Sequence, residues 1–139
     1  MGAAADQAEG EFRDKPTILL VEDDVLLRIS TADYLRSSGY HVVEAGTVIE
    51  AATVLSGGAP VQAIFSDVDL PGATGGLSFA VWVHTYYPAI PVILTSGVRA
   101  VMPALNTQQG VRFVPKPYDL ETVAIIIAGA IADAASRSG

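Results

Sequence analysis

The chain has 139 residues, a length that suits one domain with its own hydrophobic core. Half of its residues are hydrophobic, it has no cysteine, and 8 Lys and Arg against 15 Asp and Glu give a net charge of −7. This composition excludes disulfide scaffolds and thiolate chemistry, and it argues against nucleic-acid binding, which needs a basic surface.

The first 15 residues have little to bury, and they lack the basic and apolar regions of a secretion signal. The longest apolar stretch, 122–132, is shorter than the roughly 20 residues of a membrane-spanning helix. We therefore predict a disordered tail over 1–15, one domain over 16–139, no membrane contact and a cytoplasmic location.

From Thr17 onward, short apolar runs alternate with segments of helical period. The runs predict strands over 17–21, 41–45, 61–66, 91–95 and 111–115. Helices are predicted between and after them, over 25–38, 48–56, 77–87, 98–109 and 119–135, the fourth interrupted by glycine and proline. Five such repeats predict an α/β domain with a parallel sheet covered by helices on both faces.

Three short polar segments refine these elements. Asp24 directly precedes the first helix and suits its N-cap, and Thr47 with Glu50 forms a capping box for the second. The segment 72–76 is rich in glycine but lacks the spacing of a phosphate-binding loop, so we interpret it as a turn.

Polar side chains follow four of the predicted strands, at the edge where parallel sheets bind ligands. They are Glu22-Asp23-Asp24, Asp67-Val68-Asp69, Thr95-Ser96-Gly97 and Lys116-Pro117. Between Glu50 and Arg99 the only formally charged residues are Asp67 and Asp69, which disfavours an ordinary solvated surface for these two acids.

Clustered carboxylates repel one another unless a cation or a raised pKa relieves them. Glu22, Asp23 and Asp67 offer hard oxygen ligands with no histidine or cysteine beside them, which favours Mg²⁺ over zinc. Lys116 and Thr95 add an ammonium and a hydroxyl that suit an anion. The set indicates chemistry on a phosphoryl group at a carboxylate.

Four motifs occur in order along the chain: Val-Glu22-Asp23-Asp, Ser-Asp67-Val-Asp-Leu-Pro, Leu-Thr95-Ser-Gly and Phe113-Val-Pro-Lys116-Pro. Together they resemble the receiver domain of bacterial two-component response regulators, over about residues 16–136. The resemblance implies a flavodoxin-like (βα)5 fold, doubly wound, with strand order 2-1-3-4-5.

The resemblance also implies a role for each site residue. Asp67 would accept a phosphoryl group from a histidine kinase or a histidine phosphotransfer protein. Mg²⁺ would be held by Glu22, Asp23, Asp67 and the backbone carbonyl of Asp69. Thr95 and Lys116 would contact the phosphoryl group, and Phe113 would be the aromatic residue that switches with Thr95. The chain would then be a stand-alone signalling module that acts through protein contacts, and not an enzyme.

Two alternatives stay open. A haloacid-dehalogenase-like phosphatase would also use Asp67, Asp69, Thr95 and Lys116 in this order, but it requires a late acidic metal motif that the chain lacks. The other alternative is a pseudo-receiver, a binding module that keeps the fold without phosphorylation.

Two apolar surfaces indicate partners. The predicted helix 77–87 has a second apolar stripe, at Phe79, Trp82 and Tyr86, that one sheet cannot easily bury beside the first. In the last helix, Ile125 and Ile126 point away from its expected core stripe, which consists of Leu120, Val123, Ala124, Ile127 and Ile131. We expect a homodimer through this helix, unless the tail or a loop covers the two isoleucines.

Overall fold

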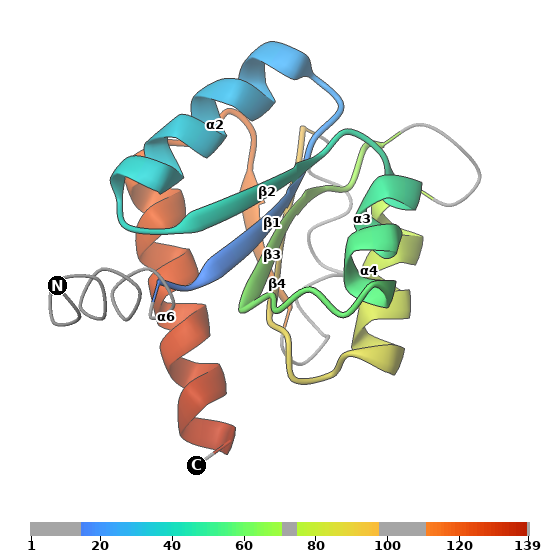
Figure 1. The fold of residues 1–139 in the computed structure, drawn as a ribbon. Coiled ribbons are helices and arrows are strands. Elements are labelled where there is room, and N and C mark those ends of the chain that lie inside the picture. Colours follow the sequence, from blue (N-terminus) through green and yellow to red (C-terminus); the bar gives the residue numbers. More distant parts are fainter. Residues whose placement is uncertain (1–14, 71–74, 98–110, 139) are drawn as a thin grey trace, which may run out of the picture.

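The computed structural model describes residues 15–70, 75–97 and 111–138. In chain order the elements are β1 (Thr17–Val21), α2 (Val25–Ser37), β2 (His41–Ala45), α3 (Val48–Ser56), β3 (Ala63–Asp67), α4 (Gly76–Tyr86), β4 (Val92–Ser96), β5 (Val111–Pro115) and α6 (Leu120–Ser138) (Figure 1). The helix predicted over 98–109 and nearly all of the predicted tail lie outside the described residues. Within those ranges, no helix has the length and apolar character to span a membrane.

The five strands form one parallel sheet in the order β2-β1-β3-β4-β5, which confirms the predicted fold class. The predicted bounds of β1, β2 and β5 are confirmed, but those of β3 and β4 are wrong by one or two residues. The pairing of β3 with β4 extends past the apolar run of β3. Asp67 pairs with Thr95, and the Val68 N–H donates a hydrogen bond to the Thr95 carbonyl at 2.8 Å.

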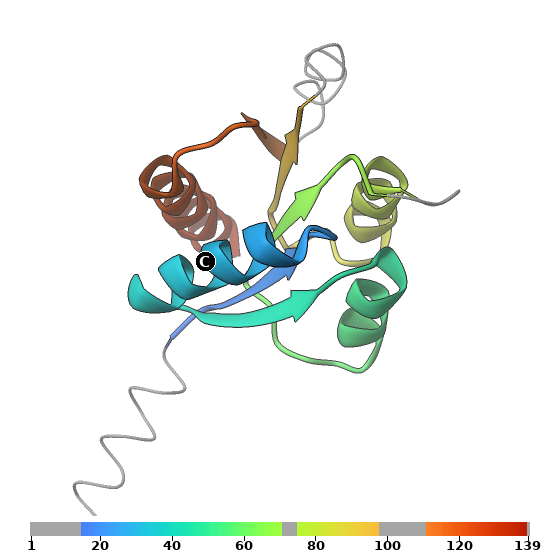
Figure 2. The ribbon, with the colours of Figure 1, turned by 90° about the horizontal axis from the view of Figure 1, so that it is seen from above.

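Alternate strand residues bury their side chains on opposite faces of the sheet. On one face, Leu19 and Val21 pack with residues of α3 and α4. On the other face, Ile18 and Leu20 pack with residues of α2 and α6. Figures 1 and 2 show these two helix pairs on either side of the sheet, so the molecule has three layers with a core in each gap.

Both predicted helix caps are confirmed. The Asp24 side chain accepts a hydrogen bond from the Leu27 N–H at 3.1 Å, and Thr47 Oγ1 accepts one from the Glu50 N–H at 3.1 Å. Glu50 Oε1 in turn accepts from the Gly46 N–H at 3.2 Å. The bonds to the Leu27 and Glu50 N–H groups satisfy donors that a helix start leaves without partners, and the Gly46 bond ties Glu50 to the residue before the cap.

The buried faces of two helices differ from the periodic pattern. In α2, Ala32 and Leu35 are buried, but Val25 and Ile29 are 54% and 46% exposed. In α6, the expectation for Ile126 is wrong, since it packs against the core cluster. Ile125 is 66% exposed, as expected.

The core stripe of α6 is also rotated from the predicted one. Its fully buried residues are Val123, Ile127 and Ala130, whereas Leu120, Ala124 and Ile131 are only half-buried. The helix therefore meets the sheet along a line through Ala130, where the small side chain permits close packing.

Candidate functional site

The sheet's carboxyl edge brings the predicted site residues together. Asp67 is the last residue of β3, the central strand, and Thr95 is its register partner on β4. Glu22 and Lys116 follow β1 and β5, and ladder-type hydrogen bonds fix both: the Glu22 N–H donates to the Ala45 carbonyl and the Lys116 N–H to the Ser96 carbonyl, each at 3.0 Å. The sheet thus positions loop residues almost as firmly as strand residues.

Lys116 connects two buried carboxylates. Its Nζ lies 3.0 Å from Asp67 Oδ2 and 3.2 Å from Glu22 Oε1. Glu22 and Asp67 are only 2% and 3% exposed. Their remaining oxygens accept backbone hydrogen bonds, Asp67 Oδ1 from the Asp69 N–H at 2.8 Å and Glu22 Oε2 from the Asp24 N–H at 3.1 Å. These contacts fix the orientation of both carboxylates before any ligand arrives.

Burial and neighbouring charges shift the pKa values of Glu22 and Lys116. Burial raises the pKa of Glu22 to about 6, the Asp67 charge adds to the rise, and the Asp24 N–H and Lys116 oppose it. For Lys116, burial alone would lower the pKa, but the contacts with Asp67 and Glu22 outweigh it and raise the pKa. The lysine therefore stays charged at neutral pH, when Glu22 is mostly ionised.

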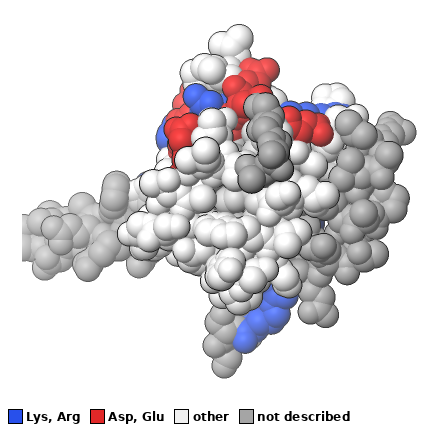
Figure 3. Space-filling view, turned by 90° about the vertical axis from the view of Figure 1, so that its right-hand side faces the viewer, with Lys and Arg blue, Asp and Glu red and all other residues white. Residues whose placement is uncertain are grey.

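Three carboxylates meet at a point suited to a hard cation. One oxygen each of Glu22, Asp23 and Asp67 lies within 4.8 Å of the others, and Asp23 is exposed to solvent. Figure 3 shows Asp and Glu gathered at this upper end of the molecule. Three carboxylate ligands without nitrogen or sulfur fit Mg²⁺, which prefers oxygen ligands and retains several waters.

The Thr95 hydroxyl is buried and has no hydrogen-bond partner among the described residues. Leaving such a group unpaired costs about 1–3 kcal/mol. Since Thr95 is the register partner of Asp67, its hydroxyl is a free hydrogen-bonding group beside the acid. An anion at Asp67 would supply the missing partner.

The structure places Asp69 and Phe113 near the site without testing their predicted roles. The Asp69 carboxylate accepts hydrogen bonds from Ser96 Oγ at 3.0 Å and from the Gly97 N–H at 3.1 Å. Phe113 pairs in register with Leu94, next to Thr95, and packs against the core beneath α3 and α4. The metal-binding carbonyl of Asp69 and the switch function of Phe113 stay predictions.

Two residues that support the site are absent from the sequence-based set. A Cβ on Gly76 would lie 2.0 Å from the Asp67 carbonyl oxygen, so only glycine lets α4 begin this close to the acid. Arg28 Nη1 donates to the Glu22 carbonyl at 2.9 Å, and its Nε lies 3.4 Å from Glu44 Oε1. The glycine pair before a helix was a visible signal, whereas the arginine contact depends on tertiary structure.

Comparison with known proteins agrees with this geometry. The sequence profile of the response regulator receiver domain matches residues 18–128. The chain belongs to this family. Receiver domains are signalling modules of two-component systems, and membership in their family does not support the phosphatase alternative.

Two curated relatives are similar to this receiver domain. The response regulator protein FleR of Pseudomonas aeruginosa is 31% identical over 113 residues, which are 80% of this chain and 24% of FleR. The sensor kinase CckA of Brucella abortus is 32% identical over 114 residues, 80% of this chain and 12% of CckA. The domain thus spans a quarter or less of these relatives.

Among solved structures, a CheY-like receiver domain protein from Methanospirillum hungatei has the same fold. It superposes with a TM-score of 0.80 at 20% identity, covering 91% of this chain and all of the other. This likeness confirms the flavodoxin-like architecture of the receiver domain.

Proposed function

We propose that this receiver domain accepts a phosphoryl group on Asp67 from a phosphohistidine of a histidine kinase or a phosphotransfer protein, in a Mg²⁺-dependent reaction. One observation carries the proposal. The Asp67 carboxylate ends the central strand, lies 3.0 Å from the Lys116 ammonium, and shares its surroundings with the carboxylates of Glu22 and Asp23 and the unpartnered Thr95 hydroxyl.

In the transfer, a carboxylate oxygen of Asp67 forms a bond to phosphorus as the phosphorus–nitrogen bond to the donor imidazole breaks. The electron pair of the broken bond stays on the imidazole nitrogen. Lys116 is placed to bind a phosphoryl or carboxylate oxygen, and the Thr95 hydroxyl donates to a phosphoryl oxygen. Bound by Glu22, Asp23 and Asp67, Mg²⁺ would offset the negative charge that the acids and the phosphoryl group bring together.

The start of α2 supports a docking surface for the phosphohistidine donor. Leu26 is 79% exposed, and its neighbours Val25 and Ile29 are about half exposed, directly after the acidic loop. A hollow of about 340 Å³ beside them is lined by Leu27, Lys116, Pro117 and Tyr118. An apolar surface next to the acceptor suits a partner that must bring its histidine to Asp67.

Intact-mass measurement after incubation with acetyl phosphate and Mg²⁺ tests the proposal. We expect one added phosphoryl group on the wild type and none on Asp67→Asn. Asp24→Asn is the matched control, since asparagine also caps helices and Asp24 lies outside the proposed metal ligands. Equal labelling of Asp67→Asn would refute the acceptor assignment, and an unlabelled wild type would favour the pseudo-receiver.

We also propose that the domain works in the cytoplasm and passes its signal on through protein contacts. The exposed Ile125 on α6 is consistent with the predicted homodimer through that helix. This dimer and the stand-alone arrangement stay predictions.

A further inference from the structure

Arg28 on α2 contacts the loop that carries two of the proposed metal ligands. Its Nη1 donates a hydrogen bond to the Glu22 carbonyl at 2.9 Å. That carbonyl belongs to the peptide group between Glu22 and Asp23, and a planar peptide group fixes the relative positions of the Cα atoms on its two sides. The contact therefore holds the backbone from which both carboxylates extend.

Asp23 depends on this backbone more than the other two acids do. Glu22 and Asp67 are buried and in contact with Lys116, which fixes their side chains. Asp23 is exposed, yet one of its oxygens lies within 4.8 Å of an oxygen of each of the other two acids. An exposed carboxylate has no surrounding core to direct it, so the position of Asp23 beside the pair follows from the backbone that Arg28 holds.

The guanidinium group is itself anchored to β2, an edge strand of the sheet. Arg28 Nε lies 3.4 Å from Glu44 Oε1, and Arg36 Nη2 lies 3.1 Å from Glu44 Oε2. The Glu22 N–H donates to the carbonyl of Ala45, the next residue of that strand, at 3.0 Å. Glu22 is thus tied to β2 through its own N–H and, by way of Arg28, through its carbonyl. A planar guanidinium with several N–H donors can make both of its contacts at once.

Gly46, the residue after β2, leaves room for this guanidinium group. A Cβ on Gly46 would lie 3.0 Å from Arg28 Nη1, closer than almost all real contacts of a Cβ atom. The Gly46 backbone is held in place, since its N–H donates to Glu50 Oε1 at 3.2 Å. A side chain at this position would therefore crowd Arg28 away from the Glu22 carbonyl.

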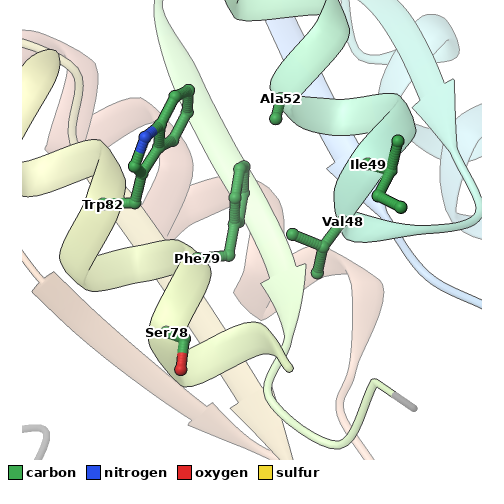
Figure 4. Close-up of a pocket in the computed structure, with 6 residues that line it drawn as sticks. All are labelled: Val48, Ile49, Ala52, Ser78, Phe79 and Trp82. Atoms are coloured by element: carbon green, nitrogen blue, oxygen red, sulfur yellow. The ribbon is translucent and has the colours of Figure 1, made fainter. Parts of the chain in front are cut away.

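The start of α3 also keeps Gly46 in place. Val48 packs against the core cluster that contains Phe79, and both residues line the groove of about 330 Å³ between α3 and α4 (Figure 4). Of the second apolar stripe predicted for α4, Phe79 is thus buried, whereas Trp82 is half-buried and Tyr86 exposed. Because Val48 is packed in this way, crowding at Gly46 would move the guanidinium group and not α3.

We propose that Arg28 is a positioning residue of the metal site: its guanidinium group holds the Glu22–Asp23 peptide so that both carboxylates converge with Asp67 on one Mg²⁺. The inference rests on the Mg²⁺ dependence of the proposed function. Positioning and charge act in opposite directions here. As a cation beside the site, the guanidinium group repels Mg²⁺, so on charge alone its removal would tighten Mg²⁺ binding. A positioning role requires that its removal weaken binding.

Titration of isotope-labelled protein with MgCl₂, followed by amide NMR shifts, measures the Mg²⁺ affinity. We expect Arg28→Met to weaken binding by about tenfold, as is typical when a group that orients metal ligands is lost. Arg28→Lys keeps the charge but cannot reproduce the two contacts of the guanidinium group, so it should also weaken binding. The lysine variant keeps the proposal testable if Arg28→Met does not fold.

Arg36→Met is the matched control. It removes the same charge from the same helix and breaks a contact with Glu44, but its hydrogen bond to the backbone goes to the Val42 carbonyl, at 3.0 Å. We expect its Mg²⁺ affinity to equal or slightly exceed that of the wild type.

Spectra recorded before Mg²⁺ is added test the contact without the metal. The amide nitrogen shift of Asp23, whose peptide group includes the Glu22 carbonyl, should change in Arg28→Met and not in Arg36→Met. A folded Arg28→Met variant that binds Mg²⁺ as tightly as the wild type, or more tightly, would overturn the positioning role alone. A wild type whose amides around Asp67 do not respond to Mg²⁺ would refute the metal site of the proposed function, and this inference with it.

Discussion

The carboxyl edge of the sheet consists of charged residues, whereas the outer face of helices α3 and α4 is mostly apolar. This α3/α4 face consists of Ile49, Ala52, Ser78, Trp82, Thr85 and Tyr86. At the edge, Glu22 and Asp67 are almost completely buried, with Lys116 between them. On the face, large apolar side chains such as Ile49 and Tyr86 are exposed, and α4 contributes no formal charge. One region buries charge, and the other leaves apolar surface in water.

Both regions cost stability in the isolated domain, but the costs differ in kind. A buried charge needs compensation from oriented partners, and removing one partner leaves the others uncompensated. The cost of exposing apolar surface to water is removed by any partner whose shape fits that surface. The edge is therefore specific for a charged ligand and sensitive to single substitutions, whereas the face tolerates substitution until a partner covers it. Four predictions test how sensitive the edge is to single substitutions.

The largest effect is expected at Gly76, where α4 approaches the acid-bearing strand. Gly76→Ala would place a methyl group 2.0 Å from the Asp67 carbonyl oxygen, and we expect a loss of about 3 kcal/mol in the free energy of unfolding. Gly129→Ala on α6 is the control: its Cβ meets open space, and alanine should stabilise the helix by about 0.5–1 kcal/mol. Urea denaturation checks both, and a neutral Gly76→Ala would contradict the close approach.

Lys116→Met should have the next largest effect, because it leaves Glu22 and Asp67 without their cation. We expect a loss of about 2 kcal/mol at neutral pH, less than for a fully buried pair because a quarter of the lysine side chain is exposed. Lys15→Met removes the same charge from an exposed position and should change the unfolding midpoint little. Equal losses in the two variants would indicate that only net charge matters.

The sequence predicts features that depend on a short stretch of the chain, but not contacts between distant elements. Apolar runs predicted β1, β2 and β5 correctly, and the parallel sheet then required Glu22, Asp67, Thr95 and Lys116 to meet at one edge. Contacts between elements were not predictable in this way. The extension of β3 to Asp67 depends on its ladder with β4, and the burial of Ile126 depends on how α6 lies on the sheet.

The site shows the same division. Residue type and position after a strand predicted the acids and the lysine of the site, because both can be determined from the sequence alone. Two features depend on distances across the fold: the Arg28 contact with the Glu22 carbonyl, and the lack of a partner for the Thr95 hydroxyl within the described part of the chain. Such supporting contacts have no periodic or spacing signature, so only the structure shows them.

Glu22 should make stability depend on pH in a direction unusual for a carboxylate. Its pKa is raised from 4.5 to about 6, so the folded state holds its proton more tightly than the unfolded state. Stability relative to Glu22→Gln should therefore fall as pH rises through this window, by about 2 kcal/mol in total. Millimolar Mg²⁺ should reverse the difference above the window, since it binds the ionised form.

Unfolding midpoints of wild type and Glu22→Gln at several pH values, with and without Mg²⁺, measure this effect. Taking the difference between the two proteins removes the titration of the groups that do not interact with Glu22. Parallel pH profiles would show that Glu22 titrates normally, and Mg²⁺ that stabilises both proteins alike would place the cation elsewhere.

The smallest expected effects come from two buried threonines. Replacing each with valine should change the free energy of unfolding in opposite directions. Among the residues that the structure describes, Thr95 Oγ1 has no hydrogen-bond partner, whereas Thr31 Oγ1 shares a hydrogen bond of 3.1 Å with the Tyr118 hydroxyl. Replacing Thr95 with valine removes an unsatisfied hydroxyl and should stabilise the domain by about 1 kcal/mol, whereas Thr31→Val loses a bond and should destabilise it by about 1 kcal/mol. Both residues are buried, so shape and burial are matched and the hydroxyl's partner is what differs. Urea denaturation without Mg²⁺ or phosphodonor measures the two changes. If Thr95→Val is as destabilising as Thr31→Val, the Thr95 hydroxyl already has a hydrogen-bond partner in the free domain and is not available to bind an anion.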